Sequence, residues 1–184
     1  MNTGPIAHRY AKALLKYVQE TGTGEAVYSQ VCVIVLRMQE ISALAEAVQR
    51  NSELALDRKL QLLDSALGEP MQEELRKFAT LVHDQKRMGF FDRMLLSFID
   101  QYRQANSIKV GKLVTASEVF GLKERLQSIL SESTGATVLL EEEINPDILG
   151  GFVFELDGNR MDASVEGQLA RIRRQLVQNN NRIV

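Results

Sequence analysis

Apolar residues recur every three or four positions through most of the first 105 residues, which is the spacing of amphipathic helices. Glycine, proline and polar clusters interrupt this pattern at 21–24, 51–52, 68–70 and 88–89. Short helices with short connections pack as antiparallel neighbours, so the pattern predicts a bundle of about six helices over residues 1–105. The apolar sets that carry it are Leu60, Leu63 and Leu67, then Leu75, Phe78, Ala79 and Val82, then Phe91, Leu95, Phe98 and Tyr102.

One apolar run, 31–36, is rich in β-branched residues and is also compatible with a buried strand. The segments on either side of it, 26–30 and 37–47, have the composition and spacing of helix. We therefore predict a core helix that passes through this run.

The apolar period changes after residue 107, where the pattern becomes that of a small α+β unit over 106–184. Strands are predicted over 109–116 and 137–144, with a helix over 122–133 between them. The predicted fold class is therefore mixed, with an N-terminal all-α antiparallel bundle followed by a small C-terminal α+β domain.

The end of this unit has a definite order. Phe152, Phe154 and Leu156 alternate as one face of a third strand. Asp157-Gly158 is a two-residue hairpin signal, so the chain is expected to return as a short fourth strand over 159–163. Ser164 is then placed as the N-cap of a final amphipathic helix.

The first helix has more apolar surface than one core face requires. On a helical wheel of about 100° per residue, its apolar side chains cover an arc of roughly 200°. The arc has two interpretations, which do not exclude each other. The helix lies centrally with neighbours on two sides, or part of the arc forms a groove for a partner's amphipathic helix. Its small residues Ala7 and Ala11 would allow another helix to approach closely.

The last predicted helix combines an apolar stripe with basic residues. The stripe is Val165, Leu169, Ile172 and Leu176. Cations in the second half of a helix suit its dipole. Together, the arginines named next could face an acidic partner or anionic lipid. For any single arginine, a solvated basic face is an equally good interpretation. The arginines are Arg171, Arg173 and Arg174, with Arg160 and Arg182 nearby in sequence.

Composition and run lengths limit the class of protein and the compartment to which the chain can belong. The 184 residues have a formal net charge of −2, with 45% apolar and 25% charged residues. These values suit a soluble globular protein, whereas a nucleic-acid binder usually shows a basic excess. The longest apolar run, 31–36, is far shorter than the roughly 20 residues that span a bilayer. No signal peptide is recognisable, and the single cysteine, Cys32, indicates a reducing compartment. We expect a cytosolic protein without a direct transmembrane segment, which can still sit on a membrane complex.

Candidate chemistry is sparse. His8 and His83 lack the neighbouring ligands of a metal site, and Cys32 lacks a basic activator, so it is interpreted as a small core residue. Gly150-Gly151 is not followed by the Lys-Ser/Thr of a phosphate loop and more plausibly permits a bulge or a close backbone approach. We expect no catalytic residue, no cofactor and no metal.

Two acidic features receive structural interpretations. The run 141–143 lies on a predicted strand, where successive side chains point to alternate faces, so a solvated sheet edge is favoured over a cation site. Asp162 and Ser164 have no histidine near them in sequence and are interpreted as helix entry and capping.

Three segments carry a family resemblance. Gly150-Gly151-Phe152, Asp162-x-Ser164 and Leu169 form the first, and Arg9-Tyr10-Ala11-x-Ala13-Leu14 forms the second. Arg87, followed by the helical pattern over 91–102, forms the third. They resemble motifs of the delta subunit family of bacterial and chloroplast ATP synthases, whose mitochondrial counterpart is the oligomycin-sensitivity-conferring protein. The resemblance covers essentially the whole chain.

The resemblance implies a non-catalytic stator subunit of the proton-translocating ATP synthase, present as one copy in a hetero-oligomeric complex. In that family the helical domain, here 1–105, caps the catalytic head and binds N-terminal segments of its alpha subunits. The C-terminal domain, here 106–184, holds the end of the peripheral stalk formed by the b subunits. This link stops the head from turning with the rotor, so that proton flow is coupled to ATP synthesis. The implied location is the cytoplasmic face of the bacterial inner membrane, through the complex.

The motif matches give two sets of candidate residues. The head-side set joins three first-helix motif residues to two added from the wheel. It comprises Tyr10, Ala11 and Leu14, with Ala7 and Leu15. The stalk-side set matches family positions that shape the C-terminal domain. It comprises Gly150, Gly151, Asp162, Ser164 and Leu169. The Asn-rich tail, 179–182, matches no motif and has no predicted role.

Two other function classes remain as alternatives. One is a helical adaptor with a regulatory α+β module, unrelated to ATP synthase. The other is an enzyme with a pocket between the halves, which is disfavoured because titratable groups do not converge in the sequence.

Overall fold

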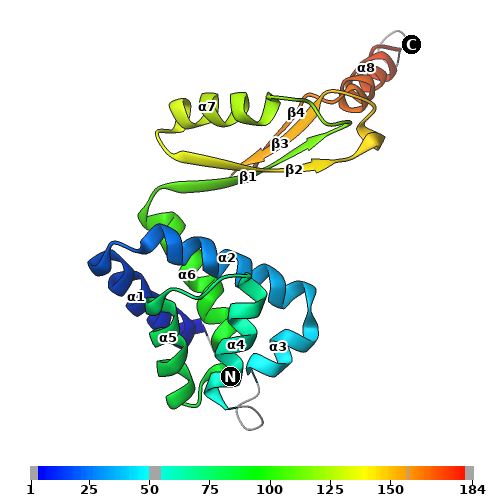
Figure 1. The fold of residues 1–184 in the computed structure, drawn as a ribbon. Helices are drawn as coiled ribbons and strands as arrows, with labels where there is room; N and C mark the ends of the chain where they lie inside the picture. The colour runs from blue at the N-terminus through cyan, green and yellow to red at the C-terminus, as the bar shows by residue number, and fades with distance from the viewer. Residues whose placement is uncertain (1–3, 50–54, 157, 181–184) are drawn as a thin grey trace. The chain divides into compact units, whose positions relative to one another are not determined.

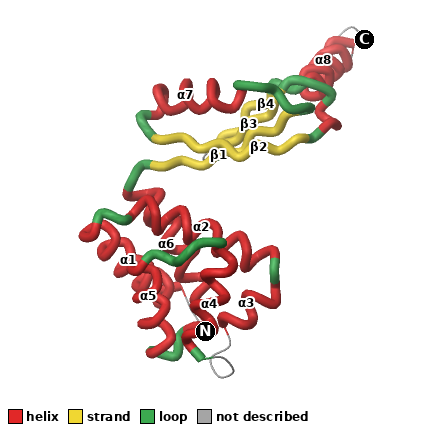
Figure 2. Tube along the Cα trace, viewed as in Figure 1, coloured by secondary structure: helices red, strands yellow, loops and turns green. Residues whose placement is uncertain are grey.

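A computed structural model describes residues 4–49, 55–156 and 158–180 (Figure 1). The chain divides into two compact units between Ala105 and Asn106, and each is described by itself. The predicted fold class is confirmed, because the first unit is helical and the second contains a four-stranded sheet with helices (Figure 2).

The first unit contains six α-helices in its described residues. They are α1 (Gly4–Thr21), α2 (Gly24–Glu40), α3 (Ser42–Gln49), α4 (Leu56–Leu67), α5 (Glu73–Asp84) and α6 (Phe91–Ala105), with a short 3-10 turn, η1 (Met88–Phe90), before α6. Helix α1 packs mainly against α6 and also touches α2 and α5. The bundle core is aliphatic and aromatic, with fully buried Val18, Ile34, Leu63, Phe91 and Phe98.

Most of the predicted helix breaks are present. Gly68 ends α4 in the left-handed conformation, with φ 74°, and its N–H donates to the Asp64 carbonyl at 3.0 Å. The run 31–36 lies inside α2, as predicted. The break predicted at 51–52 falls outside the described residues.

One break was not predicted. Helix was expected through 37–47, but Ile41 is extended, with φ −117° and ψ 91°. Its N–H closes α2 on the Arg37 carbonyl at 2.9 Å, and its own carbonyl accepts the first hydrogen bonds of α3. No glycine or proline marks this corner, so the sequence pattern gave no signal for it.

The second unit is built as β1 (Ile108–Thr115), α7 (Leu122–Thr134), β2 (Thr137–Ile144), the 3-10 turn η2 (Pro146–Ile148), β3 (Phe152–Leu156), β4 (Asn159–Asp162) and α8 (Val165–Asn180). The sheet order is β2-β1-β3-β4. Strands β1 and β2 are parallel, and the other two pairs are antiparallel. Leu156 pairs with Asn159, which confirms the tight hairpin, although Asp157 itself lies outside the described residues.

Helix α7 covers one face of this sheet (Figures 1 and 2). The covered face supplies Leu113, Val138, Leu140, Phe154 and Leu156, against which Leu122, Leu126 and Leu130 of α7 pack. The parallel β1–α7–β2 connection places the helix over the strands that it joins. The opposite side chains of the same strands form a second face, which is called the open face below.

Candidate binding surfaces

The head-side set is mostly part of the bundle core. Ala7, Ala11 and Leu14 are 5%, 0% and 2% exposed, whereas Tyr10 and Leu15 are half-buried. The three buried residues therefore hold α1 in the bundle, and Ala7 and Ala11 offer no surface to a partner in this conformation. The wide apolar arc of α1 is explained first by neighbours on several sides, namely α2, α5 and α6.

Tyr10 has a specific partner from the third motif segment. Arg87 Nη1 donates to the Tyr10 hydroxyl at 2.9 Å, and the Arg87 guanidinium carbon lies 5.5 Å from the Tyr10 ring centroid. The same ring meets Phe78 of α5 edge-on at 6.4 Å. A hydrogen bond and a cation–π contact thus fasten α1 to the turn after α5. Two segments far apart in the sequence, both picked out by motif, come together at this point.

An apolar groove runs between α1 and α5. Its volume is about 240 Å³, and its lining is Ala13, Leu14, Tyr17, Lys77, Phe78 and Leu81. Leu81 is 50% exposed although it belongs to an otherwise well-packed helix. Such an apolar hollow with a polar margin is typical of an interaction site. Of the head-side set, Leu14 lines the groove.

The margin of the groove is polar. Lys77 Nζ lies 2.6 Å from Glu73 Oε1 and 3.4 Å from the Tyr17 hydroxyl. The hydrogen bond to Glu73, followed by that to Tyr17, raises the pKa of Lys77 above its ordinary value. Because this pair is solvated, it places Lys77 at the rim and contributes little to stability.

Sequence reasoning missed the α5 half of the groove. Tyr17 and Ala13 were within the recognised wide arc but outside the head-side set. Leu81 could have been found as an apolar residue off the α5 core stripe, which is formed by Leu75, Phe78, Ala79 and Val82.

Four residues of the stalk-side set meet where α8 begins. Gly151 has φ 72°, and a Cβ placed on it would lie 2.3 Å from the Ala163 carbonyl oxygen. The predicted close backbone approach is therefore present at Gly151, where any side chain would collide. The Gly150 carbonyl accepts a hydrogen bond from the Val165 N–H at 3.0 Å, which fixes the first residue of α8.

Ser164 is the N-cap of α8, as predicted. Its hydroxyl accepts from the Gly167 N–H at 3.0 Å and donates to Asp162 Oδ1 at 2.5 Å. The Ser164 N–H also donates to Asp162 Oδ1, at 3.0 Å. These two hydrogen bonds from Ser164, with the weaker attraction of Arg171, lower the pKa of Asp162. Asp162 and Ser164 thus act in helix entry and capping, and Leu169 lies away from them with its side chain 55% exposed.

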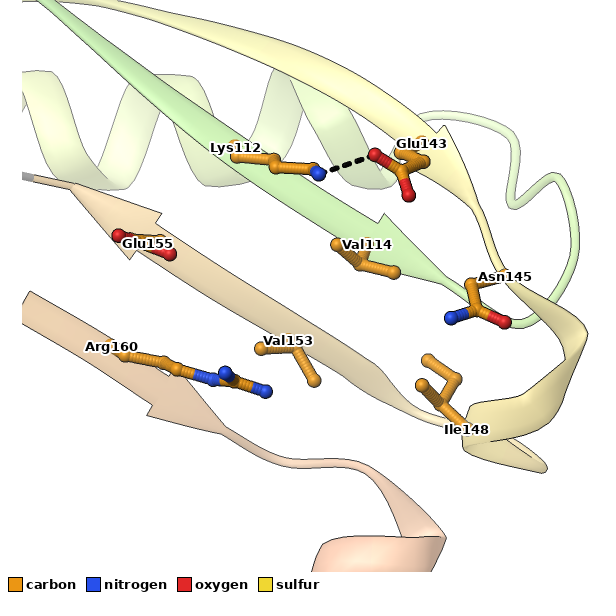
Figure 3. A pocket seen from close by; sticks show the side chains of 8 residues that line it. All are labelled: Lys112, Val114, Glu143, Asn145, Ile148, Val153, Glu155 and Arg160. Carbon is orange, nitrogen blue, oxygen red and sulfur yellow. Dashed lines mark ion pairs between the residues drawn. The ribbon is translucent and has the colours of Figure 1, made fainter.

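The open face carries a row of alternating charges across all four strands. Glu141 pairs in register with Lys112, Lys112 with Glu155, and Glu155 with Arg160. Lys112 also forms an ion pair with Glu143 (Figure 3). The hollow here, about 240 Å³, has Val114, Val153 and Ile148 beside these charges. Since cross-strand opposite charges compensate one another, the row itself selects neither an acidic nor a basic partner.

The remaining candidates have ordinary surroundings. His8 is exposed and within 3.2 Å of Gln101 Nε2, Cys32 is half-buried in α2, and residues 141–143 lie on the edge strand β2 with exposed side chains. Within the described residues, no group of three or more His, Cys, Asp or Glu side chains could hold a metal ion. The described helices also include none that is both long and apolar enough for a membrane span.

A comparison with protein families identifies the family of the chain. The family model described as ATP synthase delta (OSCP) subunit matches residues 6–176, which includes both units. The chain belongs to this family.

Individual delta subunits match over all or most of their length. The chain is 38% identical over 186 residues to the ATP synthase subunit delta of Phocaeicola vulgatus and 33% identical over 187 residues to that of Bacteroides fragilis, with 100% of each chain covered. It is 27% identical to the subunit of Gloeothece citriformis, with 91% of each chain covered.

The fold is also found in a solved structure. A chain of the Toxoplasma gondii mitochondrial ATP synthase hexamer matches with a TM-score of 0.61 at 19% identity, over 93% of this chain and 97% of that one. Delta subunits are structural members of a membrane-associated complex and not its catalytic subunits. Membership therefore accounts for motifs that fix backbone shape and bring no catalytic group with them.

Proposed function

We propose that this chain is the stator subunit that joins the catalytic head of an ATP synthase to its peripheral stalk. Residues 1–105 bind N-terminal segments of the alpha subunits, and residues 106–184 bind the end of the b stalk. One copy at the cytoplasmic face of the bacterial membrane resists the torque of the rotor, so that proton flow is coupled to ATP synthesis. The observation that carries the proposal is the apolar groove of α1 and α5 in a delta-family chain.

The head-side contact is assigned to this groove. Leu81 and Tyr17 provide partly exposed apolar surface, and Lys77 stands at the margin. A partner's amphipathic helix can bury its apolar face on such a surface while its polar face remains in water. Ala7 and Ala11 act beneath the surface by holding α1 at the correct distance from the core, and the Tyr10–Arg87 contact sets the end of the groove nearest η1.

The stalk-side contact is assigned to the second unit. Gly151, Asp162 and Ser164 do not contact the stalk themselves in this proposal, because they are engaged in fixing the start of α8. They determine the direction in which the exposed residues of α8, including Leu169, are presented.

The test is binding of a synthetic peptide that corresponds to the alpha-subunit N-terminus from the same bacterium. Wild-type protein is expected to bind it saturably. Leu81→Asp is expected to weaken binding by at least about tenfold, because a carboxylate would be desolvated in the groove. The matched control is Leu36→Asp on α2, since Leu36 is 52% exposed and lies outside the groove lining.

The control should bind as the wild type does, and circular dichroism should show the same fold for all three proteins. Absence of binding to both the peptide and the intact catalytic head would refute the head-side proposal. Equal weakening by the two aspartates would refute the assignment to the groove.

A further inference from the structure

Helix α8 exposes Val165, Leu169 and Ile172 of its apolar stripe. Each residue from Gln168 to Gln175 is exposed, and α8 is joined to the rest of its unit by hydrogen bonds from the Val165 N–H and the Arg171 side chain. Leu169 and Ile172 of the predicted stripe are 55% and 52% exposed, and Val165 is exposed at its start. An isolated helix of this length is marginal in water, so packing of the stripe against a partner would stabilise α8.

The stripe begins beside another exposed apolar side chain. Leu149 is 68% exposed, and it precedes Gly150, whose carbonyl binds the Val165 N–H. The apolar surface therefore continues from the end of η2 onto α8. It offers one long strip to a rod-like partner and differs in this from the charged open face of the sheet.

Hydrogen bonds fix the direction in which α8 leaves the sheet. Ser164 caps it on Gly167 N–H, Gly150 accepts from Val165, and Arg171 Nη2 donates to the Asp162 carbonyl at 2.8 Å. The Val165 and Arg171 hydrogen bonds join α8 to the segments before it, and the Ser164 cap belongs to the helix itself. The residues of the stalk-side set at the start of α8 thus determine the direction in which the stripe faces.

The charges of α8 select the partner. Its described side chains include three arginines, Arg171, Arg173 and Arg174, and one carboxylate, Glu166. At about 100° per residue, Arg173 lies about 40° from Leu169 on one side of the stripe, and Arg171 lies about 100° from Ile172 on the other. A second copy of α8 would bring like charges together, whereas an acidic helix would place a carboxylate against Arg173.

We propose that the exposed strip formed by Leu149, Val165, Leu169 and Ile172 binds one acidic amphipathic helix, with Arg173 pairing with a carboxylate at its edge. The inference rests on the proposed function, and it specifies that the stalk end received by this unit is helical, amphipathic and acidic. A membrane surface is the competing partner for a basic helix with an aliphatic stripe, and the vesicle measurement below separates the two.

The test uses the full chain and three synthetic peptides of about 20 residues. One is an amphipathic helix with leucines at helical spacing and glutamates elsewhere, one is its twin with lysines in place of glutamates, and one is a scrambled acidic peptide. Fluorescence anisotropy is expected to show binding of the acidic helix only. Addition of the peptide should also raise amide protection in α8, measured by hydrogen exchange.

Matched variants locate the binding site. Ile172→Asp is expected to weaken the acidic helix by at least about tenfold. Ala170→Asp adds the same charge to the same helix about 100° beyond Leu169, away from the stripe, and should change binding less than about twofold. Arg173→Glu should weaken binding more than Arg174→Glu, because Arg174 lies opposite the stripe. All four sites are exposed, so thermal unfolding should match among the variants.

Equal binding of the acidic and basic helices, or binding that Ile172→Asp leaves unchanged, would overturn the inference. Preferential binding of α8 to phosphatidylglycerol vesicles over the acidic helix would overturn it in favour of a membrane surface.

A peptide from the C-terminal end of the b subunit separates this inference from the proposed function. If that peptide binds but is insensitive to Ile172→Asp, the stalk proposal stands and the α8 inference falls. If it does not bind while the acidic helix does, the α8 inference stands and the stalk proposal falls.

Discussion

Gly151 shows how the C-terminal motif works at the scale of single residues. Its backbone has φ 72°, and the Ala163 carbonyl oxygen would lie 2.3 Å from any Cβ at this position. Both the conformation and the close approach exclude a side chain. The glycine therefore brings the end of β4 and the start of α8 against the turn that leads into β3.

Gly151→Ala should destabilise the second unit by more than a simple positive-φ glycine does. Gly158→Ala is the matched control, since Gly158 has φ 76° and open space around the position of a Cβ. We expect a loss of about 1 kcal/mol for the control and about 3 kcal/mol or more for Gly151→Ala, measured by urea unfolding. Equal losses would show that the approach to Ala163 has no energetic weight.

Ser164→Ala should remove the N-cap of α8 and cost about 1 kcal/mol in the stability of that segment. The loss should also depend on pH. Ser164 lowers the pKa of Asp162, so the ionised carboxylate stabilises the folded state at pH values above its ordinary pKa, and this contribution disappears as the pH falls through the lowered value.

The difference between wild type and Ser164→Ala is therefore expected to be constant near pH 7 and to shrink below about pH 4. Hydrogen exchange of α8 together with an NMR titration of Asp162 measures both effects. An Asp162 pKa that the substitution leaves unchanged would contradict the assignment.

At the scale of elements, most of what the sequence predicted depends on the spacing of apolar residues and on helix capping. The six helices of the bundle, the four strands and the cap of α8 follow from local apolar spacing and from Ser164. The corner at Ile41 was missed because its hydrogen bonds, not its residue type, end α2. Lys59 was also not foreseen. It is fully buried, and its Nζ donates to the Val48 carbonyl at the end of α3, a tertiary contact that no local pattern encodes.

The groove was only half predicted for a related reason. The helical wheel identified excess apolar surface on α1, but it could not show which part α6 covers and which part remains open beside α5. Ala11 is fully buried, whereas Tyr17 of α1 lines the groove together with Leu81 of α5. Periodicity defines a face, and only packing assigns it to the core or to a partner.

The contact between Tyr10 and Arg87 gives an element-scale prediction. Tyr10→Phe removes the hydroxyl that accepts from Arg87 at 2.9 Å but keeps the ring beneath the guanidinium. We expect a loss of about 1 kcal/mol from Tyr10→Phe and a larger loss from Arg87→Ala. A double-mutant cycle by urea unfolding should give a coupling of about 1 kcal/mol between the two sites. Additive losses would mean that the two side chains do not brace α1.

At the scale of the whole molecule, two units with separate cores are joined through the chain at Ala105–Asn106. A stator must transmit force from one partner to the other, so in the proposed function each unit holds one partner and the backbone between them carries the load. The chain contributes shape and strength, and the nucleotide chemistry takes place on other subunits.

Deletion of the residues after Ala105 is expected to keep head binding and to abolish coupling. The groove residues Tyr17 and Leu81 remain in the truncated chain, whereas the whole stalk-side unit is lost. The measurements are co-sedimentation with the catalytic head and proton-driven ATP synthesis in reconstituted membranes. A truncated chain that supported coupled synthesis would rule out a link with two separate contacts.

The most direct measurement cuts the link after the complex has assembled. A protease site inserted between Ala105 and Asn106 of the full chain allows the reconstituted ATP synthase to be assayed before and after cleavage, with an uncleavable insert of equal length as the control. The account predicts that cleavage abolishes proton-driven ATP synthesis while ATP hydrolysis by the head persists and each half stays with its own partner. Undiminished ATP synthesis after complete cleavage would contradict it.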